Sequence, residues 1–205
     1  MEAALGAGGE GIIKSESYLG NMLKKVAVIG PESTGKSTLC ETLAQEFDTL
    51  WCPEFAREYL LTNGTNYEYD DLLIIAMGQL ALEDEYALML ENQSITLLEK
   101  GGHIPLFIDT NMQVMKVWCE FAFGQCHRFI LDEIVKREYE LYLLCNIDLP
   151  WTSDELREYP ELETRKTLYN IYKDILINQS IPWIEISGEY DQRVKTARDA
   201  VNKIL

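Results

Sequence analysis

Residues 26–38 read Val26-Ala27-Val28-Ile29-Gly30-Pro31-Glu32-Ser33-Thr34-Gly35-Lys36-Ser37-Thr38, an apolar run followed by the pattern Gly-x-x-x-x-Gly-Lys-Ser. Glycines in this pattern let the backbone turn its N–H groups toward phosphate oxygens, and the lysine can reach the β- and γ-phosphates of a nucleotide. After the loop, Leu39, Leu43 and Phe47 recur at four-residue spacing, which predicts a helix whose N-terminus also favours anions. The stretch predicts a phosphate-binding loop, since a plain Gly-rich turn would leave Lys36 without a role.

We call residues 30–37 the phosphate loop and expect it to bind ATP and Mg²⁺, with the Ser37 hydroxyl on the metal. Guanine-binding proteins usually carry Asn-Lys-x-Asp after a late strand, and Asn146-Ile147-Asp148 lacks both the lysine and the spacing. ATP is therefore expected rather than GTP. The residues expected to contact the nucleotide are Gly30, Glu32, Ser33, Thr34, Gly35, Lys36, Ser37 and Thr38.

Short apolar segments alternate with helical patterns beyond the loop, which is typical of a parallel sheet covered by helices on both faces. We predict an α/β fold of the P-loop NTPase and kinase class, with three layers, a five-stranded parallel sheet and a lid segment. Strands are expected near 25–29, 49–52, 104–108, 139–145 and 183–186. Helices are expected over 70–98, where Leu73, Met77, Leu80 and Leu88 suggest a buried face, and over 161–179.

A length of 205 residues suits one domain of this kind, which we place at 22–205. Residues 1–21 are rich in glycine and lack periodicity, so we expect a flexible tail. Because Met22 leads directly into the first strand, it could be a translation start, and 1–21 could equally be the remnant of a linker.

The formal net charge is −16, from 18 Lys and Arg against 34 Asp and Glu. Such a field repels a nucleic-acid backbone, and no basic cluster offsets it, so we expect a small-molecule substrate and no nucleic-acid partner.

No apolar run in the sequence is long enough to span a membrane. The first residues do not have the pattern of a signal peptide. The five cysteines form no Cys-x-x-Cys pair, so we expect reduced thiols and a cytoplasmic protein.

Two acidic residues follow predicted strands at the edge of the sheet where ligands bind. Asp109 ends the strand near 104–108 and is expected to orient Mg²⁺, although it could instead cap the helix that starts at Asn111. Glu54 follows the strand near 49–52 and could accept the proton of an attacking hydroxyl or hold a sugar diol. A structural pair of Glu54 with Arg57 is the alternative.

Residues 150–166 are polar and connect the fourth strand to a helix. We expect them to form a lid that closes Arg157 and Arg165 over the transferring phosphoryl group. An ordinary solvated loop would have a similar composition.

Several segments together resemble the kinase domain of bacterial NadR proteins over residues 22–205. They are 30–38, Glu54-Phe55-Ala56-Arg57-Glu58, Met77-Gly78-Gln79, Ile108-Asp109-Thr110 and Trp151-x-x-Asp154-x-x-Arg157. The resemblance implies a ribosylnicotinamide kinase that transfers the γ-phosphoryl of ATP to the 5′-hydroxyl of nicotinamide riboside, giving nicotinamide mononucleotide in NAD salvage. It assigns Lys36 and Ser37 to the triphosphate and Mg²⁺, Asp109 to the third strand's acidic position, and Arg157 and Arg165 to the lid.

One position departs from the NadR pattern, which has a tryptophan before the glutamate that matches Glu54. Here that position is Pro53, and Trp51 lies two residues earlier, on the opposite face of an extended segment. Trp118, Tyr67 or Tyr69 could supply the aromatic surface instead. Two alternatives therefore remain: a kinase of another nucleoside-like alcohol, and an ATP-binding regulatory module that acts through a partner. The oligomeric state is not predicted.

Overall fold

The central strand of the sheet is β1 (Leu23–Ile29), which continues directly into the phosphate loop. In the computed structural model, which describes residues 22–93 and 102–205, β1 pairs in parallel with β3 (Ile104–Asp109) and β4 (Leu141–Cys145). The edges are β2 (Trp51–Cys52) and β5 (Trp183–Ile186), giving the order β2-β3-β1-β4-β5. All pairs are parallel, so the predicted five-stranded parallel sheet is confirmed.

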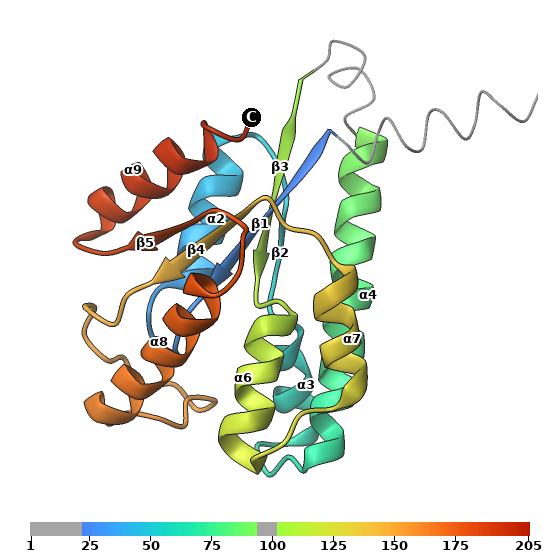
Figure 1. Cartoon of the computed structure of the whole chain (residues 1–205), viewed down its shortest axis with the longest axis vertical. Helices are drawn as coiled ribbons and strands as arrows, with labels where there is room; N and C mark the ends of the chain where they lie inside the picture. Colours follow the sequence, from blue (N-terminus) through green and yellow to red (C-terminus); the bar gives the residue numbers. More distant parts are fainter. Residues whose placement is uncertain (1–21, 94–101) are drawn as a thin grey trace, which may run out of the picture.

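The side chains of β1 alternate between two buried faces, as the two-residue period of a strand requires. Val26 and Val28 pack with α2 (Lys36–Glu46) and α9 (Tyr190–Val201). Ala27 and Ile29 pack with α4 (Tyr69–Gln93), α6 (Met112–Phe123) and α8 (Leu162–Ile177) on the other face. Figure 1 shows the resulting three layers, with the sheet in the middle.

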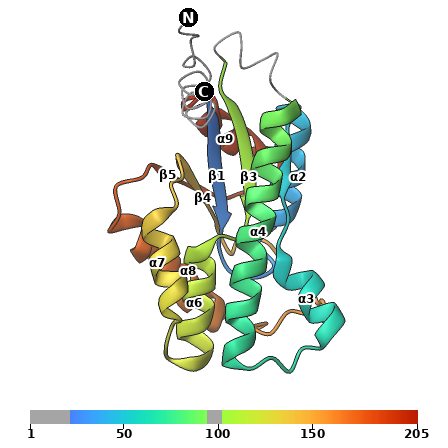
Figure 2. The same cartoon turned by 90° about the vertical axis from the view of Figure 1, so that its right-hand side faces the viewer.

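A separate helical cluster lies beyond the carboxyl ends of the strands. It joins α3 (Phe55–Asn63) and α7 (Arg128–Lys136) to the first half of α4 and to α6, around residues such as Ile75, Met115 and Ile130. In Figure 2, α3, α6 and the start of α4 lie beyond the end toward which β1 points. The cluster and the phosphate loop are therefore at the same end of the sheet, where a ligand of an open parallel sheet binds.

The face of α4 that packs inward is rotated from the one predicted. Leu80 is buried as predicted, but Met77 and Leu88 are 53% and 59% exposed, and Leu72, Ile75 and Ala76 are buried in their place. The helix is apolar around most of its circumference near residues 72–77, so periodicity alone did not identify the buried side. Residues 94–98 of the predicted helix and the predicted tail 1–21 lie outside the described residues.

Each predicted strand segment overlaps an observed strand, although β1 begins two residues before its predicted start and β3 ends one residue after its predicted end. The helix expected over 161–179 runs from Leu162 to Ile177. Consequently Arg165 lies on a helix, and only 150–161 of the predicted lid is irregular. All five cysteines are free, and four of them are buried. Within the described ranges, no helix combines the length and apolarity that a membrane span needs.

Candidate active site

The phosphate loop has the backbone geometry that its glycines predict. Gly30 adopts φ 141°, and a Cβ there would lie 2.7 Å from the carbonyl oxygen of Cys145 on the neighbouring strand. Gly35 adopts φ 76° at the N-cap of α2. A side chain at either position would be strained, so the loop passes close to β4 and enters α2 only with these residues. Lys36 extends its Nζ to 3.0 Å from the carbonyl oxygen of Pro31, across the loop.

Asp109, at the end of β3, points at the start of α2. It is 1% exposed, and its Oδ2 accepts a hydrogen bond from the Ser37 hydroxyl. Its Oδ1 is buried and has no hydrogen-bond partner among the described residues. Burial, with the nearby charge of Glu54, raises the pKa of Asp109 to about 6. An unpartnered buried carboxylate oxygen beside a serine hydroxyl is a suitable donor set for Mg²⁺.

The alternative role of Asp109 as a helix cap is wrong. Asn111 is the N-cap of α6, and its Oδ1 accepts a hydrogen bond from the Gln113 N–H at 3.1 Å. This leaves Asp109 free to face the phosphate loop.

Glu54 is the N-cap residue of α3, and its charge is close enough to Asp109 to raise the pKa of that carboxyl. Its Oε1 accepts a hydrogen bond from the Thr110 hydroxyl at 3.3 Å. Thr110 has φ 78°, a conformation that costs a β-branched residue free energy. The alternative pair of Glu54 with Arg57 is not formed, because Arg57 instead pairs with Asp154 at 3.2 Å.

A cavity of about 340 Å³ joins these groups. Its wall includes the whole phosphate loop together with Glu54, Asp109, Trp118 and Arg157. The structure thus brings a loop lysine, two carboxylates, an arginine and an aromatic ring to one space. The remaining lining residues are Thr38, Trp51, Pro53, Ala56, Arg57, Leu60, Val114, Val117, Phe121, Leu156, Glu158, Tyr159, Leu168 and Tyr172.

The segment 150–161 contacts the phosphate loop through Ser33 and Glu32. Ser33 Oγ accepts hydrogen bonds from the Thr152 N–H at 3.0 Å and from Arg157 Nη1 at 3.3 Å. Glu32, which we expected to contact nucleotide, accepts from the N–H groups of Glu158 and Tyr159 at 3.0 and 3.2 Å. Burial raises the pKa of Glu32. These contacts place 150–161 over the loop.

Arg165 lies behind Arg157, and it is only 4% exposed. Its Nη2 donates to the Ser33 carbonyl oxygen at 3.5 Å, and its guanidinium lies 5.3 Å from the ring centroid of Trp151. Burial and the charge of Arg157 lower the pKa of Arg165. The two predicted lid arginines are therefore neighbours, but Arg157 is the one on the cavity wall.

Arg193, on α9, was not predicted from the sequence. It is 4% exposed, donates to the Thr34 carbonyl oxygen at 2.7 Å and pairs with Asp148 at 2.7 Å. Asp148 also accepts a hydrogen bond from the Gly188 N–H at 2.6 Å. The sequence signal that could have identified Arg193 is its place four residues before buried Ala197, which puts this basic residue on the apolar face of α9.

The three aromatic candidates for a replacement surface lie in different places. Trp118 is on the cavity wall, and Tyr67 supports it, with Trp118 Nε1 donating to the Tyr67 hydroxyl at 2.8 Å. Tyr69 stacks on His127 instead, with ring centroids 3.8 Å apart. Trp51 packs with the α2 side of the core and also borders the cavity, as Pro53 does. The prediction that Trp51 lies on the face opposite to position 53 is wrong, because residues two apart in an extended strand share a face.

Comparisons with known proteins relate this chain to NadR proteins. The trifunctional NAD biosynthesis/regulator protein NadR of Salmonella typhimurium LT2 is 27% identical over 188 residues, which are 89% of this chain and 43% of that protein. NadR of Escherichia coli K12 is 28% identical over the same share of each chain. The chain therefore spans less than half the length of these curated relatives.

Solved structures share the fold. A NadR protein in complex with NR superimposes with a TM-score of 0.66 at 21% identity, over 89% of this chain and 50% of that chain. A NadR protein in complex with NAD and AMP-PNP gives 0.65 at 21% identity, over 89% and 49%. Thymidylate kinase of Ehrlichia chaffeensis gives 0.57 at 14% identity, over 89% and 99%. The fold is that of P-loop kinases.

A family described as AAA domain has a sequence model that matches residues 25–193. That range begins in β1, includes the phosphate loop, Glu54, Asp109 and the segment 150–161, and ends at Arg193. Since the match covers most of the chain, this protein belongs to the AAA domain family, and within it the chain is homologous to NadR.

Proposed function

We propose that the chain is an ATP-dependent kinase that phosphorylates the 5′-hydroxyl of nicotinamide riboside to give nicotinamide mononucleotide. The observation that carries the proposal is the single cavity in which the acceptor-side carboxylate Glu54 faces the phosphate loop and Asp109. A phosphate site without an acceptor would need no such carboxylate. Homology to NadR, whose solved relatives include a complex with NR, supports nicotinamide riboside as that acceptor.

Positive groups converge on the place that the transferring phosphoryl group would occupy. The loop N–H groups and Lys36 would hold the β- and γ-phosphates, and Arg157 lies against the loop on the same cavity wall, where its Nη1 donates to Ser33 Oγ at 3.3 Å. Residues 150–166 act as a lid in this proposal, because Ser33 and Glu32 already hold their backbone against the loop. Arg165 lies over the same Trp151 ring as Arg157 and donates to the Ser33 carbonyl oxygen of the loop.

Glu54 binds the acceptor. A carboxylate there accepts the hydrogen of the 5′-hydroxyl or holds the ribose diol, and the Thr110 hydroxyl orients it at 3.3 Å. The strained backbone of Thr110 sets that hydroxyl between β3 and α3.

Ser37 and Asp109 are the residues that would hold Mg²⁺, and the unpartnered buried Oδ1 of Asp109 fits this role. When bound, Mg²⁺ would neutralise negative charge on the phosphates. Because the pKa of Asp109 is raised in the metal-free site, a cation there competes with a proton.

Trp118 is our candidate for the aromatic surface that contacts the nicotinamide ring, in place of the tryptophan that Pro53 replaces. Its indole lies on the cavity wall, and Tyr67, itself hydrogen-bonded to Glu158 at 2.9 Å, fixes its orientation. A fixed aromatic face is suited to stack on a planar base.

The test is a turnover assay with MgATP and a panel of nucleosides, combined with thermal shift in the presence of an ATP analogue. We expect nicotinamide riboside to be phosphorylated fastest and to raise the melting temperature further than the analogue alone. Phosphorylation of a different nucleoside would support the kinase activity but assign it another substrate.

The replacement of the family tryptophan by Pro53 favours a second candidate, an ATP-binding regulatory module. Such a module would bind the ATP analogue and hydrolyse ATP slowly, but none of the nucleosides would raise the melting temperature or be phosphorylated. The same assay therefore separates the two functions.

A further inference from the structure

Gln79, on α4, is fully buried and bonded to the backbone on both sides of Glu54. Its Oε1 accepts a hydrogen bond from the Phe55 N–H at 2.7 Å, and its Nε2 donates to the Pro53 carbonyl oxygen at 3.2 Å. Nε2 also lies 3.4 Å from the sulfur of Cys52, whose pKa burial raises to about 12, so the sulfur is a neutral thiol. One side chain thus fixes the connection from β2 to α3.

The Phe55 N–H is one of the first amides of α3, which have no partner inside the helix. The Pro53 carbonyl oxygen precedes the helix and faces the same side chain. An amide satisfies both because it carries a donor and an acceptor. A hydrocarbon side chain would leave the Phe55 N–H without this partner and the Pro53 carbonyl oxygen with only the weak donor Cys52 Sγ at 3.6 Å, and an ionised carboxylate could not donate to Pro53.

Gly78 brings α4 close enough for these bonds. A Cβ on Gly78 would lie 2.2 Å from the ring of Phe55, so only glycine permits this approach of α4 to α3.

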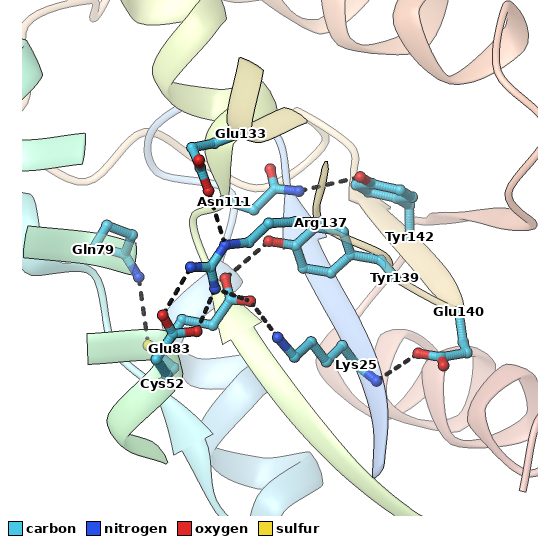
Figure 3. Close-up of polar contacts among 11 residues, drawn as sticks. Lys25, Cys52, Gln79, Glu83, Asn111, Glu133, Arg137, Tyr139, Glu140 and Tyr142 are labelled. Atoms are coloured by element: carbon cyan, nitrogen blue, oxygen red, sulfur yellow. Dashed lines mark hydrogen bonds and ion pairs between the residues drawn. The ribbon is translucent and has the colours of Figure 1, made fainter. Parts of the chain in front are cut away.

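Glu83, one helical turn after Gln79, anchors the same helix to the sheet. It is fully buried, and it accepts from Lys25 Nζ at 2.9 Å and from the Tyr139 hydroxyl at 2.8 Å. Arg137 lies 3.5 Å from it. Figure 3 shows Glu83 surrounded by these groups, with Gln79 beside Cys52. Glu83 therefore ties the helix to Lys25 of β1 and to Tyr139, which precedes β4, whereas Gln79 separately binds the connection that carries Glu54.

We propose that Gln79 is a positioning residue for Glu54, and that it sets the acceptor carboxylate against the phosphate loop. The inference rests on the proposed function, because Glu54 is given its acceptor role there. Gln79 itself does not line the cavity, so it acts through the backbone of residues 53–55 and not by touching substrate.

The main test is a double-mutant cycle between Gln79→Leu and Glu54→Gln. We expect Gln79→Leu to lower kcat/KM for nicotinamide riboside roughly tenfold to a hundredfold, with the affinity for an ATP analogue changed less than about twofold. In the Glu54→Gln background, Gln79→Leu should add little further loss, because the carboxylate that it positions is gone. Equal losses in both backgrounds would overturn the inference.

Glu83→Gln is the matched control, since it changes a buried polar residue on the same helix without touching residues 53–55. We expect a lower melting temperature and nearly unchanged turnover. If Gln79→Leu behaved in the same way, Gln79 would be a structural residue only.

Gln79→Glu keeps the shape and gives a pH-dependent readout. A protonated glutamic acid donates to Pro53 as the amide does, whereas the ionised form cannot, and burial keeps its pKa high. The turnover of this variant relative to wild type should fall as pH rises. The nearby titratable groups are Cys52, in contact with Gln79, and Glu83, one helical turn further along α4. Asp109 titrates in the variant and in wild type alike, so its effect cancels in the ratio of their turnover rates. A constant ratio below one would count against the inference.

Amide exchange at Phe55 gives a measurement that needs no substrate. Its N–H should exchange faster in Gln79→Leu than in wild type and Glu83→Gln. If the wild-type protein phosphorylated no nucleoside, the proposed function would be wrong. The exchange rate at Phe55 would still show whether Gln79 holds the backbone of residues 53–55. Unchanged exchange at Phe55 would overturn the inference whatever the substrate is.

Discussion

Asp109 is a carboxylate that the fold buries beside a second carboxylate, Glu54. Burial raises its pKa from 3.8 to about 6, so the folded protein holds the proton more tightly than the unfolded chain does. A raised carboxyl pKa favours folding below the unfolded pKa, and this contribution is lost as pH rises through about 6. Without a bound metal, the ionised Asp109 carboxylate therefore lowers the stability of the folded protein at neutral pH.

We predict that Asp109→Asn becomes more stable relative to wild type as pH rises from about 4 to 8. The change in the difference between the two free energies of unfolding should be about 3 kcal/mol, at ~1.4 kcal/mol for each pKa unit. The measurement is urea unfolding at several pH values without nucleotide or Mg²⁺. A difference that does not vary with pH would contradict the raised pKa, and Glu54→Gln should reduce the effect.

Lys36→Ala is predicted to abolish phosphoryl transfer and to leave the fold intact. The lysine contributes charge to the transition state, and its hydrogen bond inside the protein is to the Pro31 carbonyl of the same loop. We expect turnover to fall at least a hundredfold, while the melting temperature of the nucleotide-free protein stays near that of wild type. Near-normal turnover in the variant would refute the role of the phosphate loop.

Lys36, Ser37 and Asp109 could be found from the sequence because a local pattern or a strand end marks each of them. Arg193 could not, and Gln79 appeared only within the Met77-Gly78-Gln79 segment of the NadR resemblance, with no role assigned to it. Each lies far along the chain from the backbone group that it binds, and only packing brings α9 to Thr34 and α4 to Pro53. In the sequence, a residue such as Arg193 is marked only by being polar on an otherwise apolar helix face.

At the scale of elements, the site depends on how α3 and α4 pack. The sequence predicted α4 but not α3, because a short helix of mixed polarity has weak periodicity. It also assigned the wrong face of α4, since apolar residues surround the helix near its start. Gly78 explains the observed contact, because its missing Cβ admits the Phe55 ring.

Gly78→Ala is predicted to destabilise the protein by roughly 1–3 kcal/mol through overpacking against Phe55. In a Phe55→Ala background the same change should cost much less, because the ring that it meets is absent. Chemical denaturation of the four proteins measures the coupling. Equal costs in the two backgrounds would show that helix packing at Gly78 does not depend on Phe55.

The lid arginines are predicted to act mainly on turnover. Arg157→Ala should reduce kcat by on the order of a hundredfold or more, with a smaller effect on ATP binding, because the charge that it meets develops during transfer. Arg157→Lys should rescue poorly, since a point charge does not reproduce the planar fork of a guanidinium. Steady-state rates with nicotinamide riboside and saturating MgATP give the measurement.

Arg165→Ala should reduce kcat as well, and it should also lower the melting temperature, because its buried guanidinium packs on Trp151. Exposed Lys166, the next residue on α8, provides the control, and Lys166→Ala should change neither quantity. Wild-type rates in both alanine variants would make 150–166 an ordinary surface segment.

At the scale of the whole molecule, a chain of net charge −16 must bind a polyanion through a few placed groups. The sheet order places these groups together: β1 supplies the loop, β3 supplies Asp109, and the connection after β2 supplies Glu54. The sequence predicted this arrangement because strand ends of a parallel sheet share one edge. The base of the nucleotide was harder to predict from the sequence. Its recognition depends on residues after β4 and β5, and their contacts with each other form only when the chain folds.

Those contacts predict a preference for ATP over GTP. A guanine-reading aspartate must leave its carboxylate open to the base, but Asp148 is bonded by Arg193 at 2.7 Å and by the Gly188 N–H at 2.6 Å. At a hundred times its Kd, a Mg²⁺-bound ATP analogue stabilises the native state by about 2.7 kcal/mol. For a protein of this size that corresponds to a rise of roughly 5–10 °C in melting temperature.

The corresponding GTP analogue at the same concentration should give a clearly smaller rise, and Lys36→Ala should reduce both rises because they share the phosphate contacts. Calorimetric titration of the two analogues checks the same preference without heating. Equal or tighter binding of the GTP analogue would mean that the base is read elsewhere than at Asp148, and the side chains of the β5–α9 connection would then be the first to replace.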